Sequence, residues 1–291
     1  ARLDGAPRAA GIARDVSAEA VLALENPLRL GVCAGLLLAL AIAERVWPRR
    51  GDARPAWRQV TNLALMAIDT ALLRVVFPVL AVAFAAGLAA RDIGLLPWLG
   101  IDGWIAVVLA ILALDLAIYW QHRLFHRIPL LWRLHRVHHA DTAFDVTLAV
   151  RFHPLEIALS MAIKFAVVAA LGAPPLAVLL FEVALSAGSL FTHADLRLPP
   201  RLERALRWLV VTPYMHRIHH SVHRAETDSN FSFHLSLWDR LFGSYVDAPR
   251  DGHAGMAIGL HEFRAPADQT LPALLLNPFR DPPATGRATE A

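Results

Sequence analysis

Long apolar stretches alternate with short, arginine-rich segments along the chain, and this pattern predicts a bundle of membrane-spanning helices. An apolar helix needs roughly 20 residues to cross a bilayer. Five apolar stretches approach or exceed that length: 28–43, 62–90, 98–120, 154–171 and 175–191. The second is longer than one span needs and contains Asp69, Arg74 and Pro78, so we expect it to be tilted, kinked or partly interfacial.

The ends of these stretches agree with a membrane setting. Tyr119 and Trp120 close the third stretch, and such an aromatic pair is typical of the membrane–water boundary. The short turn 172–175 contains a glycine and two prolines, which predicts a helical hairpin between the fourth and fifth stretches. Lys164 lies in the middle of the fourth stretch, so we expect it either to extend toward the interface or to pair with Glu182 across the hairpin.

Composition supports the membrane class. Of the 291 residues, 56% are apolar and 18% are charged, whereas soluble domains carry about 25% charged residues. The net charge is +3, but the basic residues lie at the ends of apolar stretches, which indicates anionic lipid headgroups as partners and argues against nucleic acid. The only cysteine, Cys33, excludes an intramolecular disulfide and a thiolate metal cluster.

The distribution of arginines predicts the topology. Residues 45–58 carry five arginines, whereas 91–97 carries only Arg91 and the turn 172–175 carries none. The positive-inside rule therefore places three segments in the cytoplasm: 44–61, 121–153 and 192–291. This assignment puts all fourteen histidines on the cytoplasmic side. Heavy use of alanine, and of arginine in place of lysine, is typical of a GC-rich bacterial genome, so we expect a bacterial inner membrane.

Histidine motifs carry the candidate chemistry. Twelve of the fourteen histidines fall between positions 122 and 234. Eight form three motifs: His122-Arg-Leu-Phe-His126, His135-Arg-Val-His138-His139 and His216-Arg-Ile-His219-His220. Spacings of three and four residues place imidazoles on one face of a helix. Neutral imidazole binds iron, zinc, copper and nickel, and eight exceed the needs of one ion, so the sequence predicts two metal ions. The alternative is a set of surface histidines at the membrane interface, which the repeated spacing counts against.

Six further residues are candidates either for ligands or for groups that orient a ligand through its free N–H: His153, His193, His223, Asp115, Glu156 and Asp141. Asp115 lies one heptad before His122, within a span, where a carboxylate is costly unless paired. The alternatives are interfacial positions for His153 and His193, a surface position for His223, and an interhelical hydrogen bond for Asp115.

The three motifs resemble the histidine boxes of the fatty acid hydroxylase / sterol desaturase superfamily. Four other segments resemble that family: Arg151-Phe-His153-Pro-Leu-Glu156, Thr192-His193-Ala-Asp195, Asp228-Ser-Asn230-Phe-Ser-Phe and Trp238-Asp-Arg-Leu-Phe-Gly243-Ser-Tyr245. The resemblance covers residues 112–246. The chain has Asp195 where the family commonly has asparagine, and Ser232 where it commonly has glycine.

The resemblance implies an all-α fold, a multi-pass transmembrane helical bundle with a cytosolic helical cap that holds a histidine-rich dimetal site. It also implies two iron ions, with zinc as an alternative occupant in purified protein, O2 as co-substrate, and hydroxylation or desaturation of a lipid without catalytic residues beyond the metal ligands. The chain has no His-Pro-Gly-Gly segment of the cytochrome b5 type. We therefore expect a separate electron donor, ferredoxin-like or cytochrome b5-like, with its reductase.

The expected organisation has four parts. They are an interfacial or flexible segment at 1–27, transmembrane helices over 28–120, a hydroxylase-like domain over 112–246, and a C-terminal segment over 247–291 with a disordered tail. Two other functions fit a histidine cage. One is a metal-dependent hydrolase, which the absence of a His-Glu-x-x-His motif counts against. The other is a non-catalytic membrane protein with a structural metal site.

Overall fold

The computed structural model describes residues 17–52, 54–77 and 79–282. Over these residues the chain is helical, and its only β-type pairings are isolated bridges such as that between Val210 and Leu235. The all-α prediction is confirmed. The longest helices are α1 (Ala18–Val46), α2 (Ala56–Val76), α5 (Gly103–Arg127), α7 (Pro154–Leu171) and α8 (Pro175–His193).

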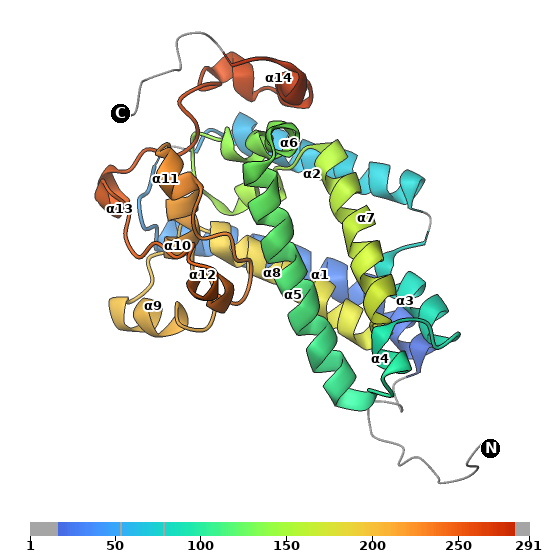
Figure 1. The fold of residues 1–291 in the computed structure, drawn as a ribbon. Coiled ribbons are helices and arrows are strands. Elements are labelled where there is room, and N and C mark those ends of the chain that lie inside the picture. Colours follow the sequence, from blue (N-terminus) through green and yellow to red (C-terminus); the bar gives the residue numbers. More distant parts are fainter. Residues whose placement is uncertain (1–16, 53, 78, 283–291) are drawn as a thin grey trace, which may run out of the picture.

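Shorter helices complete the fold. They are α3 (Ala81–Ala89), α4 (Leu95–Trp98), α6 (Pro129–His139), α9 (Pro200–Leu206), α10 (Pro213–His219), α11 (Arg224–Thr227), α12 (Leu237–Leu241), α13 (Gly252–Gly255) and α14 (Leu271–Leu276), with 3₁₀ helices η2 (Val146–Val150), η3 (Pro266–Gln269) and η4 (Asn277–Phe279). Figure 1 shows α5 and α7 extending from the end of the molecule that holds α4 toward α6, while α1 and α8 cross behind α5.

Five helical segments are long and apolar enough to cross a membrane: α1, the run Ala56–Ala89, α5, α7 and α8. Their outward faces carry large apolar side chains, such as Val75, which is 80% exposed, and Ile105, which is 68% exposed. Such surfaces are unfavourable in water and suit lipid. The protein is therefore a multi-pass membrane protein.

Two of the predicted segments have different bounds in the structure. The helix α1 begins at Ala18, where the Ser17 side chain accepts a hydrogen bond from the Ala20 N–H, so residues 18–27 are continuous with the first long helix. Residues 1–16 and 283–291 of the expected terminal segments lie outside the described residues. The second apolar stretch is divided into α2 and α3, with a break between Val76 and Ala81, which agrees with the expected kink.

The helix α8 is the centre of the bundle and packs against α1, α3 and α5. The core between these helices includes Val82, Val107, Leu114, Val178 and Phe181. The expected pairing of Lys164 with Glu182 across the hairpin is confirmed, and both side chains are buried. Arg29 of α1 binds the other oxygen of Glu182 at 2.9 Å, so one buried carboxylate joins three helices.

The turns before α4 and after α7 pack against each other at the end of the bundle that holds α4 (Figure 1). Gly94 has φ +121°, and a Cβ atom at that position would lie 2.1 Å from the Gly172 backbone nitrogen. Only glycine allows this backbone approach. The two arginine-poor connections therefore lie together, as expected for turns on the same side of the membrane.

The segments that follow α5 and α8 form a cap at the other end of the bundle. Buried ion pairs hold this cap to the helices. Arg58 binds Asp141 through Nε at 2.5 Å and also binds Asp145, which ties α2 to the loop before η2. Asp195 accepts hydrogen bonds from Arg54 at 2.6 Å and from Arg217 at 2.9 Å. Removing one partner of such a buried pair typically costs 3–5 kcal/mol, roughly, so the cap is tied firmly to the helix ends.

Candidate metal centre

The C-terminal parts of four helices, α5, α6, α8 and α10, lie close together in the cap. His122 and His126 lie near the end of α5, which stops at Arg127, and α6 starts at Pro129 after the single residue Ile128. The other histidines lie on α6 and α10, at the last residue of α8, and just after α10: His135, His138, His139, His193, His216, His219 and His220. Helix C-termini carry partial negative charge, so their convergence favours cations.

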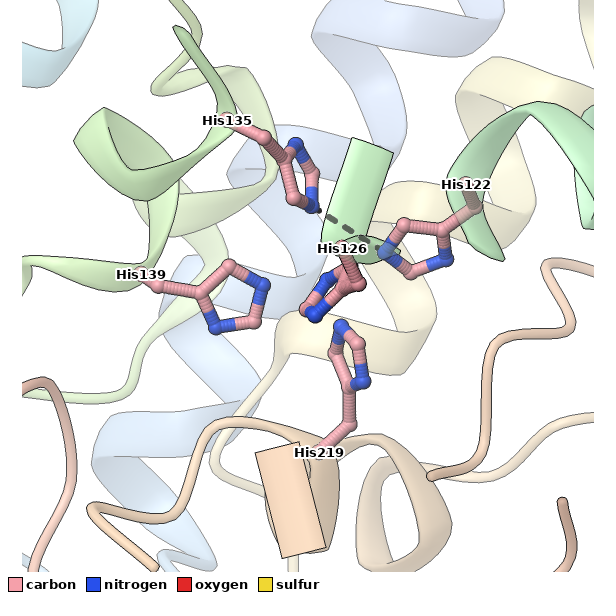
Figure 2. A group of neighbouring side chains, drawn as sticks. All are labelled: His122, His126, His135, His139 and His219. Atoms are coloured by element: carbon pink, nitrogen blue, oxygen red, sulfur yellow. Dashed lines mark hydrogen bonds between the residues drawn. The ribbon is translucent and has the colours of Figure 1, made fainter. Parts of the chain in front are cut away.

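The histidines form two groups, and within each group the ligand nitrogen atoms all lie within 4.8 Å of one another. The first group is His122, His126, His135, His139 and His219, and the second is His138, His193, His216 and His220. Figure 2 shows the five rings of the first group pointing toward one another from α5, α6 and α10. The structure thus brings together all eight motif histidines and adds His193.

The spacing of the inner nitrogens fits metal coordination. His122 Nε2 lies 3.1 Å from His135 Nε2 in the first group, and His193 Nε2 lies 2.9 Å from His216 Nε2 and 3.1 Å from His138 Nε2 in the second. Two imidazoles bound at about 2.1 Å from one ion, at right angles, have nitrogens ~3 Å apart. The geometry therefore suits imidazoles that share an ion.

Buried nitrogens without hydrogen-bond partners give a second reason. All nine rings are at most 3% exposed. The Nε2 atoms of His126, His139 and His219 are buried and have no hydrogen-bond partner among the described residues. An unsatisfied buried polar atom costs about 1–3 kcal/mol, and a metal ion would satisfy several of them together. The residues present therefore fit a metal centre.

Outer nitrogens are held by protein oxygens, which orients the rings. In five histidines Nδ1 donates outward: His122 to Phe231 O at 2.7 Å, His135 to Glu156 Oε1 at 2.7 Å, His138 to Arg151 O at 3.2 Å, His193 to Ser189 O at 2.7 Å and His219 to Ser229 O at 2.7 Å. A neutral ring that donates from Nδ1 presents the Nε2 lone pair on its other side. These contacts therefore prepare the inner nitrogens for metal binding.

Burial also keeps the imidazoles in the neutral form. It lowers the pKa of His135 to about 3. The pKa values of five other rings are lowered well below the usual 6.5, first by burial and then by repulsion from neighbouring histidines: His138, His139, His216, His219 and His220. Metal binding requires neutral imidazole, so these rings are ready to bind near pH 7.

Comparisons with known proteins agree with this centre. Residues 107–244 match the family described as fatty acid hydroxylase. These residues are a fatty acid hydroxylase domain. The match includes all three histidine motifs, so the resemblance inferred from them is confirmed.

Relatives of the hydroxylase domain are named for reactions on lipids. Ornithine lipid hydroxylase OlsE of Rhizobium tropici is 34% identical over 155 residues, 52% of this chain and 45% of that protein. Alkylglycerol monooxygenase of Homo sapiens is 32% identical, over 52% of this chain and 32% of that protein. Cholesterol 25-hydroxylase of Rattus norvegicus is 29% identical, over 49% of this chain and 47% of that protein. The aligned part is thus less than half of each relative, and no solved structure matches the chain significantly.

His153 and His193, two candidates of the hydroxylase domain, have different surroundings. His193 is a member of the second group. His153 lies outside both groups, because its Nδ1 accepts the Leu155 N–H at 3.2 Å and its Nε2 donates to Leu275 O at 3.1 Å. His153 is thus the N-cap of α7 and anchors the C-terminal segment.

Of the four remaining candidates, one contacts a histidine of the first group and three do not. Glu156 bonds His135, as expected for a group that orients a ligand. The other three lie outside both histidine groups and bond elsewhere: Asp115 to His234 Nδ1 at 2.6 Å and Trp238 Nε1 at 2.8 Å, Asp141 to Arg58 and Asn62, and His223 to Asp251 at 2.6 Å. Asp115 thus makes the interhelical hydrogen bond given as its alternative, from α5 to Trp238 of α12.

Two supporting residues were not on the candidate list. Asp228 Oδ1 lies 3.4 Å from His126 Nδ1. Asp239 accepts the backbone N–H groups of Phe231 and Ser232, at 2.7 and 3.0 Å, and so holds the loop whose Phe231 carbonyl binds His122. Asp228 and Asp239 lie within the two segments, beginning at Asp228 and at Trp238, that resemble the family. Their place in these segments was the sequence feature that could have identified them as supporting residues.

A cavity of about 300 Å³ opens beside the first group. Residues of α1, α2, α5, α7 and α8 line it, and His122 and His135 form part of its wall. Most of the lining is apolar, including Ile118, Phe152 and Phe233. The candidate metal centre of the hydroxylase domain is therefore accessible from an apolar space inside the helical bundle.

Proposed function

We propose that this protein is a membrane-bound hydroxylase that oxidises a C–H bond of a lipid with O2 at a pair of iron ions. One observation carries the proposal. Two buried histidine groups lie inside the cap, and the first group, which has unpaired Nε2 atoms, adjoins an apolar cavity within a bundle of membrane-spanning helices. A lipid chain suits such a cavity, and the relatives are named as lipid hydroxylases or monooxygenases.

The proposed ligands are the eight motif histidines together with His193. Iron bound there would supply the reduction of O2 and the removal of hydrogen from carbon. In hydroxylation one oxygen atom enters the C–H bond and the other leaves as water, with two electrons and two protons consumed. In desaturation two hydrogens leave the lipid and both oxygen atoms leave as water. The electrons come from a separate ferredoxin-like or cytochrome b5-like donor with its reductase.

The protein's own residues bind the lipid and position the histidine rings. The apolar lining holds the lipid and excludes water, while Glu156 and the backbone carbonyls fix the rings. We propose that the centre faces the cytoplasm of a bacterial inner membrane. Support comes from the arginine-rich connection, because Arg54 and Arg58 bind Asp195 and Asp141 at the cap end of the bundle, opposite the arginine-poor turns.

Comparative lipid mass spectrometry of expressing cells tests the function. We expect one lipid to gain a single oxygen atom with the wild type and with His261→Ala, an exposed control, but not with His138→Ala. A lipid that loses two hydrogens would instead assign a desaturase. Tightly bound zinc with ester cleavage would assign a hydrolase, and a metal-loaded protein without turnover would assign a structural site. Identical lipidomes from wild type and His138→Ala, with iron loaded and reductant supplied, would contradict the proposal.

A further inference from the structure

We propose that Asp69 binds a hydrogen-bond donor of the substrate lipid, a hydroxyl or an amine, inside the cavity beside the metal centre. This inference rests on the proposed function and adds the chemical class of the substrate. Asp69 lies on α2, lines the cavity that His122 and His135 also line, and is only 7% exposed.

The Asp69 carboxylate has no partner among the described residues. Within that part of the chain no hydrogen bond or ion pair involves it, and its Oδ1 atom is buried and unsatisfied. A carboxylate within a membrane-spanning helix is costly unless it is paired, and intramembrane carboxylates commonly mark a binding path. The group that pairs with Asp69 is therefore expected to come from the cavity.

Glu156 adds a second acceptor to the same wall. Its Oε1 atom accepts from His135 at 2.7 Å, while its Oε2 atom is buried without a partner among the described residues. Both carboxyl groups line the same cavity. The wall beside the metal centre thus offers carboxylate oxygens that lack matching donors, in a cavity that is otherwise largely apolar.

The cations of the cavity are already neutralised. Arg29 binds Glu25 at 3.0 Å and Glu182 at 2.9 Å, and Lys164 also binds Glu182. Two cations therefore face two carboxylates, and neither cation is left for an anionic lipid headgroup. The unmatched polar atoms near the cavity are carboxyl oxygens. A fatty acid carboxylate would find no free cation there, whereas a hydroxyl or an ammonium group would supply the missing donor.

Asp69 also lies outside residues 107–244, the part of the chain that matches the hydroxylase family. The metal-binding histidines belong to the shared domain, while Asp69 belongs to the preceding helices of this chain. The proposed donor-binding residue is therefore separate from the part of the chain that carries the metal-binding histidines.

Binding of four C16 probes to the purified, metal-loaded protein in detergent tests the proposal: hexadecane, hexadecanoate, hexadecan-1-ol and hexadecylamine. We expect the alcohol or the amine to bind the wild type about tenfold more tightly than the alkane, since a hydrogen bond to a charged group is worth about that factor. We expect the carboxylate to bind no better than the alkane. The preferred probe identifies a hydroxyl or an ammonium group as the donor.

Variants test whether Asp69 causes the preference for the alcohol or the amine. Asp69→Leu removes an unpaired carboxyl group from an apolar helix, so we expect it to fold and to lose most of the preference for the alcohol or the amine over the alkane. Asp69→Asn retains an acceptor oxygen, so it is expected to keep alcohol binding within about threefold and to lose the amine preference. Met66→Leu, a volume-conserving change in the same cavity wall, should keep the wild-type pattern.

Two results would overturn the inference: a wild type that binds hexadecane or hexadecanoate as tightly as the alcohol and the amine, or an Asp69→Leu protein that keeps the wild-type preference. The assay measures binding without turnover. Failure of the proposed hydroxylation, seen as unchanged lipidomes, is therefore distinguishable from failure of Asp69 as the donor-binding residue.

Discussion

Glu156 Oε1 lies 2.7 Å from His135 Nδ1, and this contact joins the first turn of α7 to the first histidine group on α6. A carboxylate that accepts from the outer nitrogen of a ligand fixes the ring and raises the basicity of its inner nitrogen. Both side chains are buried, His135 at 2% and Glu156 at 3% exposure, so water does not compete for the contact.

Replacing Glu156 by leucine should therefore weaken the metal centre. We expect metal affinity or activity to fall by roughly 10–100-fold, because the His135 ring loses its orienting acceptor. Metal content after dialysis against a chelator measures the effect. Glu156→Gln retains one acceptor oxygen and should fall between the wild type and the leucine variant, while Glu19→Gln, an exposed control, should leave the metal content unchanged. Equal metal retention in all four proteins would refute the role.

His193 and His153 offer a matched pair of substitutions. His193→Ala removes one of the four nitrogens of the second group, so we expect a reduced metal content per chain and loss of activity. His153→Ala should retain the full metal content, because that ring binds Leu275 O and the Leu155 N–H instead. Its expected cost is stability, about 1 kcal/mol for a lost helix cap. Elemental analysis of the two proteins decides, and a full metal complement in His193→Ala would exclude it as a ligand.

Acid should destabilise the metal-free protein. The folded-state pKa of His135 is lowered to about 3, whereas an unfolded chain protonates histidine near 6.5. Below pH 6.5, roughly, the unfolded state therefore binds more protons, and stability falls as the pH drops toward 3. Each such ring contributes a slope of up to about 1.4 kcal/mol per pH unit.

Thermal unfolding of chelator-treated protein between pH 8 and pH 4 measures this dependence. We expect a flat midpoint above about pH 7 and a steep fall below about pH 6, since several rings share the lowered pKa. Metal-loaded protein should resist acid further, because bound metal competes with protons for the same nitrogens. A midpoint that is independent of pH over this range would contradict the burial of neutral rings.

The contact between the arginine-poor turns should depend on the absence of a side chain at Gly94. A Cβ atom there would lie 2.1 Å from the Gly172 nitrogen, so Gly94→Ala forces the two turns apart. Gly100 also has positive φ, at +69°, but a Cβ atom at that position would meet nothing within 4 Å among the described residues. We expect Gly100→Ala to cost about 1–2 kcal/mol from backbone strain alone and Gly94→Ala to cost clearly more. Equal unfolding temperatures for the two variants would argue against the close packing.

Much of the architecture follows from local pattern. Apolar runs of sufficient length predict helices that can cross a bilayer, and the three histidine motifs predict metal-binding faces, because spacing along one helix is a local property. The pairing of Lys164 with Glu182 was also foreseeable, since the short turn at 172–175 makes the two helices antiparallel neighbours.

Local pattern could not separate residues that look alike in sequence. Asp115 and Glu156 are both carboxylates a few residues from a candidate histidine, yet Asp115 binds His234 and Trp238 while Glu156 binds His135. The choice depends on which element lies opposite each carboxylate. That neighbour is set by the packing of helices far apart in the chain, and no spacing rule encodes it.

The sequence by itself determined the helical membrane class, the three histidine motifs and the family resemblance. Only the tertiary structure decided how the histidines are divided. His138 and His139 are adjacent in sequence but belong to different groups, and so do His219 and His220. Successive residues of a helix point about 100° apart, so neighbours face different partners. His193 joins the second group because α8 ends beside α10, a relation that exists only once the bundle has formed.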